Sequence, residues 1–396
     1  NKLLKSGEIM EDNDLLKVRL EKIAALKAAG VDLYPNDAKP QNTTTQILQE
    51  FGGTDSDGLA KLERKFSLAG RLMAVRSFGK AAFVKIQDRK GQIQCYLAKN
   101  ILSEKDFSLF KKMDIGDIIY ISGKLFRTKT NELTLEVQSL RLMAKSIRPL
   151  PEKWHGLTDI ETRYRQRHLD LISNPAVKEI FIRRSRIIRL IRQFMDRHDF
   201  LEVETPMMQP KAGGAVARPF KTHHNALDQD FYLRIAPELY LKRLVTGGLE
   251  RVYEINRNFR NEGISTFHNP EFTMMEFYQS YATYEDLMSF TEELFTFIAR
   301  EIFGKLTFTY QGTEIDLTPP WRRLSVKEGL VEIAGMTLDD LADHAKAFDF
   351  ASKIGCDVKE TDPLGKILMA VFDERVEKKL VQPTFVTDYP VAVSPL

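Results

Sequence analysis

The sequence predicts an α+β protein with two domains, a small N-terminal β-barrel and a larger domain of mixed helices and strands. Three observations lead to this expectation. The chain has 396 residues, which is more than one typical hydrophobic core accommodates. Short segments of alternating apolar and polar residues follow one another from Phe66 to Val137, as in a small all-β unit. Beyond residue 168, longer segments with helical periodicity alternate with a few strand patterns.

The composition is that of an ordinary globular protein, with 43% hydrophobic and 29% charged residues. The net charge of +3 does not exclude a nucleic-acid partner, because basic residues can be concentrated locally. Cys95 and Cys356 lack any metal-ligand spacing, so we expect no disulfide framework, no structural zinc site and a reducing cytoplasm. No apolar run reaches about 18 residues, so we expect no membrane-spanning segment.

Residues 1–65 are expected to form an N-terminal helix and a linker. The helix is predicted over 11–29, because apolar residues recur at helical spacing and Gly30 follows as a stop signal. The apolar stripe of this helix consists of Leu16, Leu20, Ile23 and Leu26. Residues 34–65 are rich in Pro, Asn, Thr, Asp and Gly, which favours a linker with one short helix.

The barrel is predicted over residues 66–147. Its candidate strands are Ser67–Val75, Ala82–Gln87, Gln92–Leu97, Asp117–Ser122, Lys124–Arg127 and Glu132–Val137. One helical segment, Glu104–Met113, interrupts them after the third strand. A small barrel with a helix between its third and fourth strands is typical of an OB-fold, although the pattern alone also allows a generic β-barrel.

A basic, proline-marked connection over residues 148–168 is the predicted hinge, and the second domain is expected over 169–396. This domain begins with a long helix at Asn174-Pro175, since Asn is a favoured cap and Pro is tolerated at the first helical position. Further expected elements are a strand over 200–206, a helix over 284–303, a mainly helical insertion over about 321–380 and a strand-like segment over 383–393.

Residues 251–282 carry the most chemistry, and they are predicted to form a strand, a loop and a second strand. Alternation along the second strand puts Phe272, Met274, Glu276 and Tyr278 on one face. A carboxylate and a phenol beside an aromatic ring suit cationic and ring-bearing ligands. Arg260 is suited to bind a phosphate or carboxylate bidentately. The residues also leave open a plain hairpin with a surface ion pair.

At this segment the sequence resembles a known family. FRNE at 259–262, followed by HNPEFTMMEFY at 268–278, resembles motif 2 of the class II aminoacyl-tRNA synthetases, in the form found in bacterial lysyl-tRNA synthetases. The helix over 176–198 with FLEVETP after it resembles motif 1, and residues 211–248 resemble the segment between the two motifs. The likeness includes the barrel, so it covers nearly the whole chain.

The resemblance implies a class II catalytic domain, built on an antiparallel sheet with flanking helices, that follows an OB-fold anticodon-binding domain. The implied activity is ATP-dependent activation of L-lysine to lysyl-adenylate, with Mg²⁺ as cofactor, and transfer of lysine to tRNA(Lys). The implied protein is a cytoplasmic homodimer joined through motif 1, without a membrane partner.

For the nucleotide, the resemblance implies five residues. Arg260, the catalytic residue, is expected to bridge the α-phosphate and the amino acid carboxylate, because a guanidinium offsets the repulsion between two anions that must meet. Phe272 is expected to stack on adenine, and Glu262, His268 and Asn269 to hold the nucleotide. For His268, an exposed loop histidine without a ligand is the alternative.

For lysine, the resemblance implies Gly214, Glu238, Glu276 and Tyr278 together with Arg260. Glu238 and the backbone near Gly214 are expected to bind the α-ammonium, and Glu276 and Tyr278 to face the ε-ammonium. The alternative for Glu238 is a plain capping role, since it lies in the first turn of a predicted helix. The alternative for Gly214 is an ordinary loop.

In the barrel, Phe83, Gln94 and Glu132 match the residues with which the family binds the anticodon. Stacking on an aromatic ring and hydrogen bonds to base edges are how such barrels recognise unpaired RNA. Phe83 alternates with Val84 on a predicted strand, so a place in the barrel core is its alternative.

Motif 3 of the family, a glycine-rich strand and helix with a second ATP-binding arginine, does not occur before Leu396. It is expected beyond this residue, together with the acidic residues that hold Mg²⁺. No metal ligand is therefore assigned within this chain, and the chain is expected to be inactive by itself. The alternatives are a non-catalytic tRNA-binding fragment and an aspartyl- or asparaginyl-type synthetase, whose side-chain pocket would have to be basic.

Overall fold

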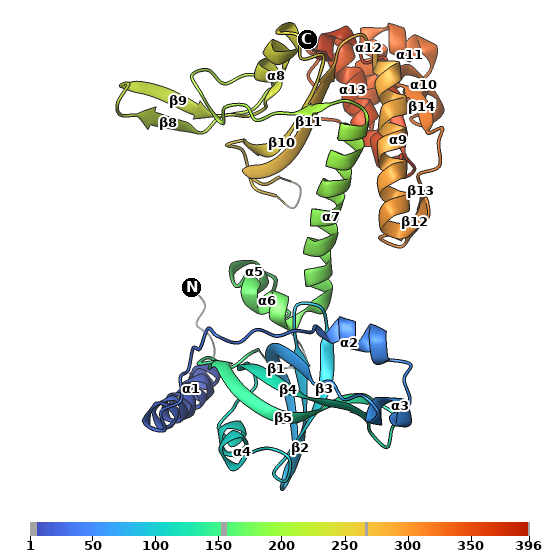
Figure 1. Cartoon of the computed structure of the whole chain (residues 1–396). Coiled ribbons are helices and arrows are strands. Elements are labelled where there is room, and N and C mark those ends of the chain that lie inside the picture. Colours follow the sequence, from blue (N-terminus) through green and yellow to red (C-terminus); the bar gives the residue numbers. More distant parts are fainter. Residues whose placement is uncertain (1–5, 152–156, 266–267, 395–396) are drawn as a thin grey trace. The chain divides into compact units, whose positions relative to one another are not determined.

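A computed structural model of the chain describes residues 6–151, 157–265 and 268–394, with only the backbone described for residues 6–13. The chain divides into two compact units, residues 1–178 and 179–396, and the division falls within one long helix. Figure 1 labels the helices and strands of both units. Of the predicted hinge over 148–168, residues 152–156 lie outside the described residues.

The first unit is built around a closed five-stranded barrel. Its strands are β1 (Phe66–Phe78), β2 (Ala81–Gln87), β3 (Gln92–Ala98), β4 (Ile118–Arg127) and β5 (Leu133–Ala144), in the order β1-β2-β3-β5-β4. The helix α4 (Glu104–Lys111) lies between β3 and β4 in the chain. This is the layout of an OB-fold, so that prediction is confirmed. The barrel is filled by apolar residues such as Leu68, Val84 and Leu135, each at most 1% exposed.

Two predicted strands, Asp117–Ser122 and Lys124–Arg127, are one continuous strand, β4. Its pairing with β5 shifts register between Ser122 and Gly123. At Gly123 a β-carbon would lie 1.8 Å from the carbonyl oxygen of Glu136, so glycine is required for the two strands to approach. The glycine that separated the predicted strands therefore marks an irregularity inside one strand.

The predicted linker contains two short helices, where one was expected. These are α2 (Thr44–Phe51) and α3 (Ser56–Ala60). A capping box formed by Thr43 and Gln46 begins α2. Ile47 and Phe51 of α2 join the hydrophobic core of the barrel, so this part of the linker is a packed element of the unit.

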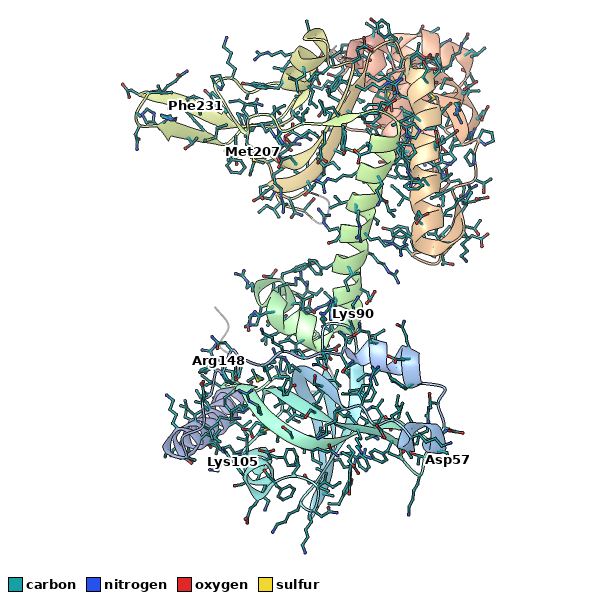
Figure 2. The ribbon with its side chains drawn as sticks, in the orientation of Figure 1. Asp57, Lys90, Lys105, Arg148, Met207 and Phe231 are labelled. Carbon is teal, nitrogen blue, oxygen red and sulfur yellow. The ribbon has the colours of Figure 1, made fainter. Side chains whose placement is uncertain are left out.

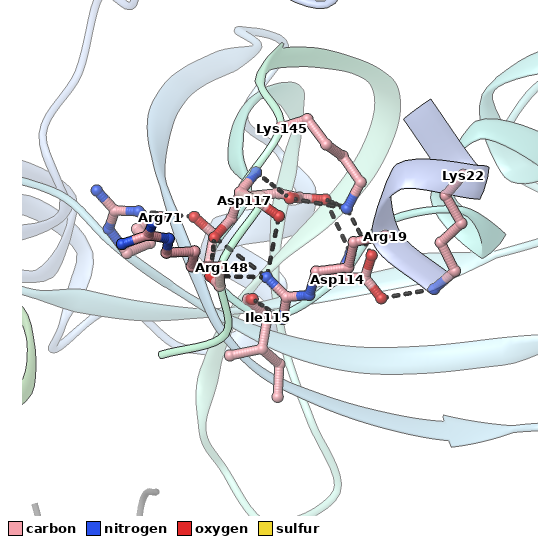
Figure 3. Close-up of polar contacts among 10 residues, drawn as sticks. Arg19, Lys22, Arg71, Asp114, Ile115, Asp117, Lys145 and Arg148 are labelled. Carbon is pink, nitrogen blue, oxygen red and sulfur yellow. Dashed lines mark hydrogen bonds and ion pairs between the residues drawn. The ribbon is translucent and has the colours of Figure 1, made fainter. Parts of the chain in front are cut away.

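The N-terminal helix α1 (Ser6–Ala28) is fixed to the barrel by apolar residues such as Leu26 and by a buried arginine (Figure 3). Leu20, expected on the buried stripe, is 48% exposed, whereas Arg19 is only 8% exposed. The Nη1 atom of Arg19 donates hydrogen bonds to the carbonyl oxygens of Ser146 at 2.9 Å and Arg148 at 3.1 Å. Its Nη2 donates to the carbonyl oxygen of Ile115 at 3.1 Å. Leu20 thus belongs to the predicted apolar stripe but stays exposed, because the barrel presents carbonyl oxygens to the neighbouring Arg19 at this turn of the helix.

Beside this contact, Lys145 is buried between two aspartates (Figure 3). Its Nζ lies 2.5 Å from Oδ2 of Asp114 and 2.9 Å from Oδ2 of Asp117, and the side chains of Lys145 and Asp117 are fully buried. Lys22 of α1 approaches Oδ1 of Asp114 at 2.5 Å. Burial raises the pKa of Asp114, but the hydrogen bonds from Lys145 and Lys22 outweigh it and lower that pKa overall. The group thus ties α1 to the end of the barrel.

Three helices follow the barrel, α5 (Ile160–Arg165), α6 (Arg167–Ser173) and α7 (Pro175–Arg197). The carboxylate of Asp170, which is fully buried, accepts hydrogen bonds from Nε of Arg163 at 2.9 Å and Nδ2 of Asn174 at 2.6 Å. This carboxylate links α5, α6 and the start of α7. The long helix begins at Pro175, as predicted.

The second unit has a central sheet of three strands in the order β11-β10-β6. β10 (Arg251–Phe259) pairs antiparallel with β11 (Glu271–Gln279) and parallel with the short β6 (Leu201–Glu202). The predicted strand over 200–206 is therefore confirmed at only two residues. One face of the sheet packs on α7 and on α9 (Tyr284–Phe303). The buried residues of this core are Phe194, Met195, Phe200, Tyr253 and Leu294.

The remaining elements surround this sheet. A second sheet has the order β7-β9-β8, and Phe231 lies on its middle strand (Figure 2). Its strands are β7 (Met208–Gln209), β8 (Lys221–His224) and β9 (Gln229–Leu233), and α8 (Glu238–Thr246) follows them. The elements beyond α9 are β12 (Thr307–Tyr310), β13 (Thr313–Asp316), β14 (Arg322–Ser325), α10 (Val326–Glu332), α11 (Leu338–Ala342), α12 (His344–Lys353), α13 (Leu364–Arg375), η1 (Glu377–Lys379), β15 (Thr384–Thr387) and η2 (Val391–Val393).

The segment over 321–380 is mainly helical, as predicted, and has its own hydrophobic core. The strand-like segment at its end supplies β15, which pairs parallel with β14. Among the helices of the described residues, none is both long and apolar enough to cross a membrane.

Candidate active site

The polar face of the β10–β11 pair carries the densest set of functional groups in the second unit. The antiparallel register places four residues of β10 opposite four of β11. The pairs are Val252 with Tyr278, Glu254 with Glu276, Asn256 with Met274 and Asn258 with Phe272. Because side chains alternate along a strand, these eight residues share one face, opposite the face that packs on α7 and α9. The predicted grouping of four β11 residues on one face is confirmed. β10 adds a buried carboxylate, Glu254, to the same face.

A cavity of about 250 Å³ lies at the loop end of this face. It is lined by Arg260, Glu262, Gly263, His268, Asn269 and Phe272. The five residues expected to hold the nucleotide therefore surround one cavity. The imidazole of His268 is exposed, and its Nδ1 lies 2.8 Å from Oγ of Ser265.

Arg260 follows β10 and stands over the ring of Phe272, with the guanidinium carbon 5.2 Å from the ring centroid. Its Nε is buried and has no hydrogen-bond partner within the described residues. A buried donor without a partner costs about 1–3 kcal/mol, so a ligand that supplies an acceptor here would be stabilised. A phosphate or a carboxylate fits, since a guanidinium binds both in a planar, charge-assisted geometry.

Gly214 and Glu238 come together at the start of α8. The backbone of Gly214 has φ +88°, and a β-carbon there would lie 2.9 Å from Cβ of Glu238. Glycine is therefore required on two grounds, backbone conformation and space. Glu238 does not cap the helix: its carboxylate Oε1 accepts from Nζ of Lys242 at 2.7 Å, and the cap residue Pro237 supplies no side-chain hydrogen bond. The plain capping alternative for Glu238 has no support in these contacts.

Three carboxylates stand at this end of the polar face, and they differ in their partners. Glu254 is paired with Arg234 at 2.7 Å, and both side chains are 1% exposed. Glu238 is paired with Lys242. Glu276 is half-buried and accepts a hydrogen bond from the hydroxyl of Tyr278 at 2.6 Å, but among the described residues no cation pairs with it. The arrangement leaves room for one positive charge beside Glu276.

Burial is the main cause that raises the pKa of Glu276 above its ordinary value. The hydrogen bond from Tyr278 lowers this pKa, while the negative charges of Glu238 and Glu254 add to the rise. Burial and the hydrogen bond to Glu276 also raise the pKa of Tyr278, so this phenol stays protonated and donates. A carboxylate in such surroundings gains more from a cationic ligand than an exposed one does.

The sequence argument missed Arg234, the buried partner of Glu254. The signal was present, because Arg234 stands among apolar residues in the run Leu233-Arg234-Ile235-Ala236. A charged side chain in such a run is either exposed by a turn or buried with a partner, and periodicity alone does not decide between the two.

In the barrel, Phe83 lies on the outer face of β2 and is half-exposed, while its neighbour Val84 is 1% exposed in the core. The alternative that placed Phe83 in the barrel core was wrong. The ring of Phe83 meets that of Phe78 edge to face, with the centroids 5.6 Å apart, and lies tilted against that of Tyr96, with the centroids 5.1 Å apart. A cavity of about 450 Å³ beside it is lined by Ala74, Val75, Arg76, Phe83, Val84, Lys85, Gln94 and Glu132.

Phe83, Gln94 and Glu132 thus line one cavity of the barrel. The amide Nε2 of Gln94 donates a hydrogen bond to Oγ1 of Thr134 at 3.0 Å. This bond fixes the orientation of the Gln94 amide. Arg76 and Lys85 in the same lining were not singled out from the sequence, and they make the cavity basic.

The described residues contain no group of three His, Cys, Asp or Glu side chains that could hold a metal ion. The exposed His223 has carboxylate neighbours, Asp230 at 3.1 Å and Asp228 at 3.4 Å, within the β8–β9 hairpin.

Comparisons with known proteins agree with this geometry. A family model described as "tRNA synthetases class II (D, K and N)" matches residues 159–396, and one described as "OB-fold nucleic acid binding domain" matches 66–143. The lysine–tRNA ligase of Carboxydothermus hydrogenoformans is 53% identical over 389 residues, 98% of this chain and 78% of that protein. The lysine–tRNA ligases of Moorella thermoacetica and Erwinia tasmaniensis are 52% and 51% identical over 97% and 98% of this chain, and 77% of each relative. The chain belongs to the lysine–tRNA ligases of the class II tRNA synthetases.

Proposed function

We propose that the polar face of β10–β11 is the surface on which this enzyme activates L-lysine with ATP before lysine is transferred to tRNA(Lys). The observation that carries the proposal is Glu276, the half-buried carboxylate for which the described residues provide a hydroxyl but no cation. An ammonium on a long, flexible stem is the complementary ligand, because it brings a compact positive charge to the far end of a pocket.

ATP is proposed to occupy the cavity around Arg260. Phe272 offers an aromatic face for adenine beside the guanidinium of Arg260. Glu262, His268 and Asn269 surround the same cavity and are proposed to hold the nucleotide with polar contacts. The buried, unpaired Nε of Arg260 supports this assignment, because an α-phosphate oxygen would supply the missing acceptor.

Lysine is proposed to lie along the same face, with its two ends bound by different groups. Glu238 and the backbone at Gly214 are assigned to the α-ammonium, and Glu276 with Tyr278 to the ε-ammonium. Arg260 is assigned to the carboxylate of lysine as well as to the α-phosphate. One oxygen of that carboxylate attacks the α-phosphorus, and pyrophosphate leaves as the new bond forms.

Arg260 is the residue that this step requires most. Two anions have to approach within bonding distance, and a fixed guanidinium lowers their repulsion without reorganisation. Mg²⁺ is proposed to accompany ATP and to polarise its phosphates. Since the described residues offer no converging metal ligands, no step is assigned to residues that hold the ion.

The barrel is proposed to bind the anticodon at the cavity beside Phe83. Phe83 supplies a half-exposed ring for base stacking, and Gln94 and Glu132 supply hydrogen-bonding groups for base edges. Arg76 and Lys85 give this cavity the charge that a phosphate backbone favours.

A homodimer in the cytoplasm is the proposed form of the protein. In the second turn of α7, Ile180 is 65% exposed and Ile182 is 48% exposed, and exposed apolar side chains of this size are suited to an isologous contact. Light scattering should report twice 45.5 kDa for the 396-residue chain, and Ile180→Glu should shift it toward the monomer. A monomer at micromolar concentration before any substitution contradicts the proposal.

The activity is tested by ATP–pyrophosphate exchange with each of the twenty amino acids in a full-length enzyme that carries motif 3, because the 396-residue chain is expected to be inactive by itself. We expect exchange with lysine and not with aspartate or asparagine, because the unpaired charge of the side-chain pocket is negative. Exchange with aspartate would require a basic pocket and would overturn the assignment of Glu276 and Tyr278.

A further inference from the structure

We infer that Arg234 is a positioning residue for lysine selection: by pairing with Glu254, it leaves Glu276 as the anion of this face that a substrate ammonium neutralises. The inference rests on the proposed role of Glu276. It adds a residue that lies on a different segment, between β9 and α8, and that does not belong to the lining of the nucleotide cavity.

The need for such a residue follows from the strand register. Glu254 and Glu276 are direct partners across the antiparallel β10–β11 pair and share the polar face. Directly opposed side chains have β-carbons about 4.5–5.5 Å apart, and like charges at this separation destabilise each other. Without a compensating cation, one of the two carboxyl groups would take up a proton, and the pair would hold a single negative charge.

Arg234 is placed to prevent this. Its backbone N donates to the carbonyl oxygen of Met207 at 2.8 Å, and its carbonyl oxygen accepts from the N of Phe259 at 2.9 Å. Its side-chain Nε donates to the carbonyl oxygen of Arg257 at 3.0 Å, and Nη1 reaches Oε1 of Glu254 at 2.7 Å. The residue is 1% exposed, so the position of its charge is fixed by both backbone and side-chain contacts.

Glu254 has its remaining hydrogen-bonding capacity filled. Oε1 also accepts from the N of Thr205 at 3.2 Å and from Nδ2 of Asn256 at 3.2 Å, and Oε2 accepts from Oγ1 of Thr205 at 2.7 Å. A carboxylate with four donors has little left for a ligand. The two glutamates are therefore divided into a structural anion, Glu254, and an available anion, Glu276.

The charged groups around Glu276 act in opposite directions. Arg234 favours its ionised form, and Glu254 on β10 and Glu238 on α8 disfavour it. Lys242 of α8 is paired with Glu238 and lies 5.9 Å from the ring centroid of Tyr278. Removing the charge of Arg234 leaves Glu254 to oppose the ionisation of Glu276. Removing the charge of Glu254 leaves Arg234 without its partner, and its guanidinium then competes with the substrate ammonium for the carboxylate of Glu276.

Because Arg234 and Glu254 have opposite effects on the ionisation of Glu276, their removal should shift the pH dependence of lysine binding in opposite directions. Lysine affinity is measured by calorimetry as a function of pH in the enzyme and in the variants Arg234→Met, Glu254→Gln and Arg234→Met/Glu254→Gln. Lysine binding requires ionised Glu276, so it is lost as pH falls through the pKa of this carboxyl group. We expect Arg234→Met to move this loss to higher pH and Glu254→Gln to move it to lower pH.

On the acid side of the loss, a shift of one pH unit corresponds to about a tenfold change in lysine affinity, downward in Arg234→Met and upward in Glu254→Gln. At neutral pH, Glu254→Gln is expected to weaken lysine binding for a different reason, because Arg234 then competes with the substrate ammonium for Glu276. The double variant removes both charges, and we expect its lysine affinity and pH profile to return to within about threefold of the original enzyme. Arg257→Met is the matched control, because it removes an arginine of β10 from an exposed ion pair with Glu271 at 3.5 Å. ATP affinity, measured with ATP alone, is expected to stay within about twofold in every variant.

A merely structural role for Arg234 gives a different result. The single variants would then lose lysine and ATP binding together, their pH profiles would move in the same direction or not at all, and the double variant would not recover. That result overturns the inference. If Arg234→Met does not fold, the downward shift in Glu254→Gln and the recovery in the double variant still decide it. The proposed role of Glu276 fails separately, when Glu276→Gln leaves lysine affinity unchanged.

Discussion

Replacement of Glu276 by glutamine is expected to weaken the use of lysine far more than the use of an uncharged analogue. Glutamine keeps the size of the side chain and can still accept a hydrogen bond from Tyr278, now 2.6 Å from Oε1 of Glu276. The ε-ammonium of bound lysine loses its anion, because Glu254 remains paired with Arg234 and Glu238 is assigned to the α-ammonium.

The expected loss is about 2–4 kcal/mol, from the range found when one partner of a buried charge pair is removed. Glu276 is half-buried, so water screens part of the interaction, and the lower half of that range is favoured. A loss of this size corresponds to about 30- to 1,000-fold in the KM for lysine or in its affinity.

Lysine-dependent ATP–pyrophosphate exchange in the full-length enzyme that carries motif 3 measures this effect, with norleucine as the analogue that lacks the ε-ammonium. Norleucine should lose much less than lysine from the same substitution, and the KM for ATP should change by no more than about twofold. Glu271→Gln is the control, since it removes a carboxylate from the exposed start of the same strand. The raised pKa of Glu276 also predicts a pH dependence: lysine use should fall as the pH drops through this pKa. This fall at low pH should disappear in Glu276→Gln. Equal losses for lysine and norleucine would refute the reasoning and give Glu276 a structural role only.

Three further outcomes are expected. Phe83→Ala should weaken tRNA binding by about 1–3 kcal/mol through lost base stacking while lysine activation is unchanged, and a parallel fall in activation and thermal stability contradicts this. Gly214→Ala should raise the KM for lysine, because a left-handed backbone strains an L-residue by about 1–2 kcal/mol and the added carbon meets Glu238 at 2.9 Å. Gly248→Ala, with φ +99° and open space around it, should leave that KM unchanged, so equal effects at both glycines point to backbone strain alone. Lys145→Met should lower the free energy of unfolding of the barrel unit by about 3–5 kcal/mol in urea denaturation, since Asp117 stays buried without its cation. The less buried Lys22 should cost no more than about 1 kcal/mol when replaced by methionine, and similar losses for the two lysines would mean that burial of the ion pair is not the cause.

Elements with strong local signals could be predicted from the sequence. The helix expected over 284–303 has these bounds in the structure, because Thr283 and Asp286 form a capping box and Gly304 ends the helix with φ +69°. The succession of the barrel strands along the chain, with a helix between β3 and β4, followed in the same way from short alternating segments. The site residues of β11 could be grouped on one face because alternation is a local property of a strand.

Features that depend on distant partners could not be predicted in this way. Gly123 interrupts an alternating pattern, and only the approach of Glu136 on β5 shows that the strand continues through it. Leu20 and Arg19 are neighbours on α1, and the carbonyl oxygens of residues 115, 146 and 148 decide that the arginine is the buried one. Local periodicity contains no information about such acceptors.

Glu254 and Glu276 are the clearest case, since two residues of one type stand opposite each other on one face. Nothing in the two strands tells which of them is available to a ligand. The distinction comes from Arg234, which the connection between β9 and α8 brings into an ion pair with Glu254. A chain with the same two strands and an apolar residue at position 234 should therefore share one proton between the glutamates at neutral pH and bind a cation weakly. On the proposed assignment, recognition of lysine on this face depends on a buried arginine that does not itself face the substrate.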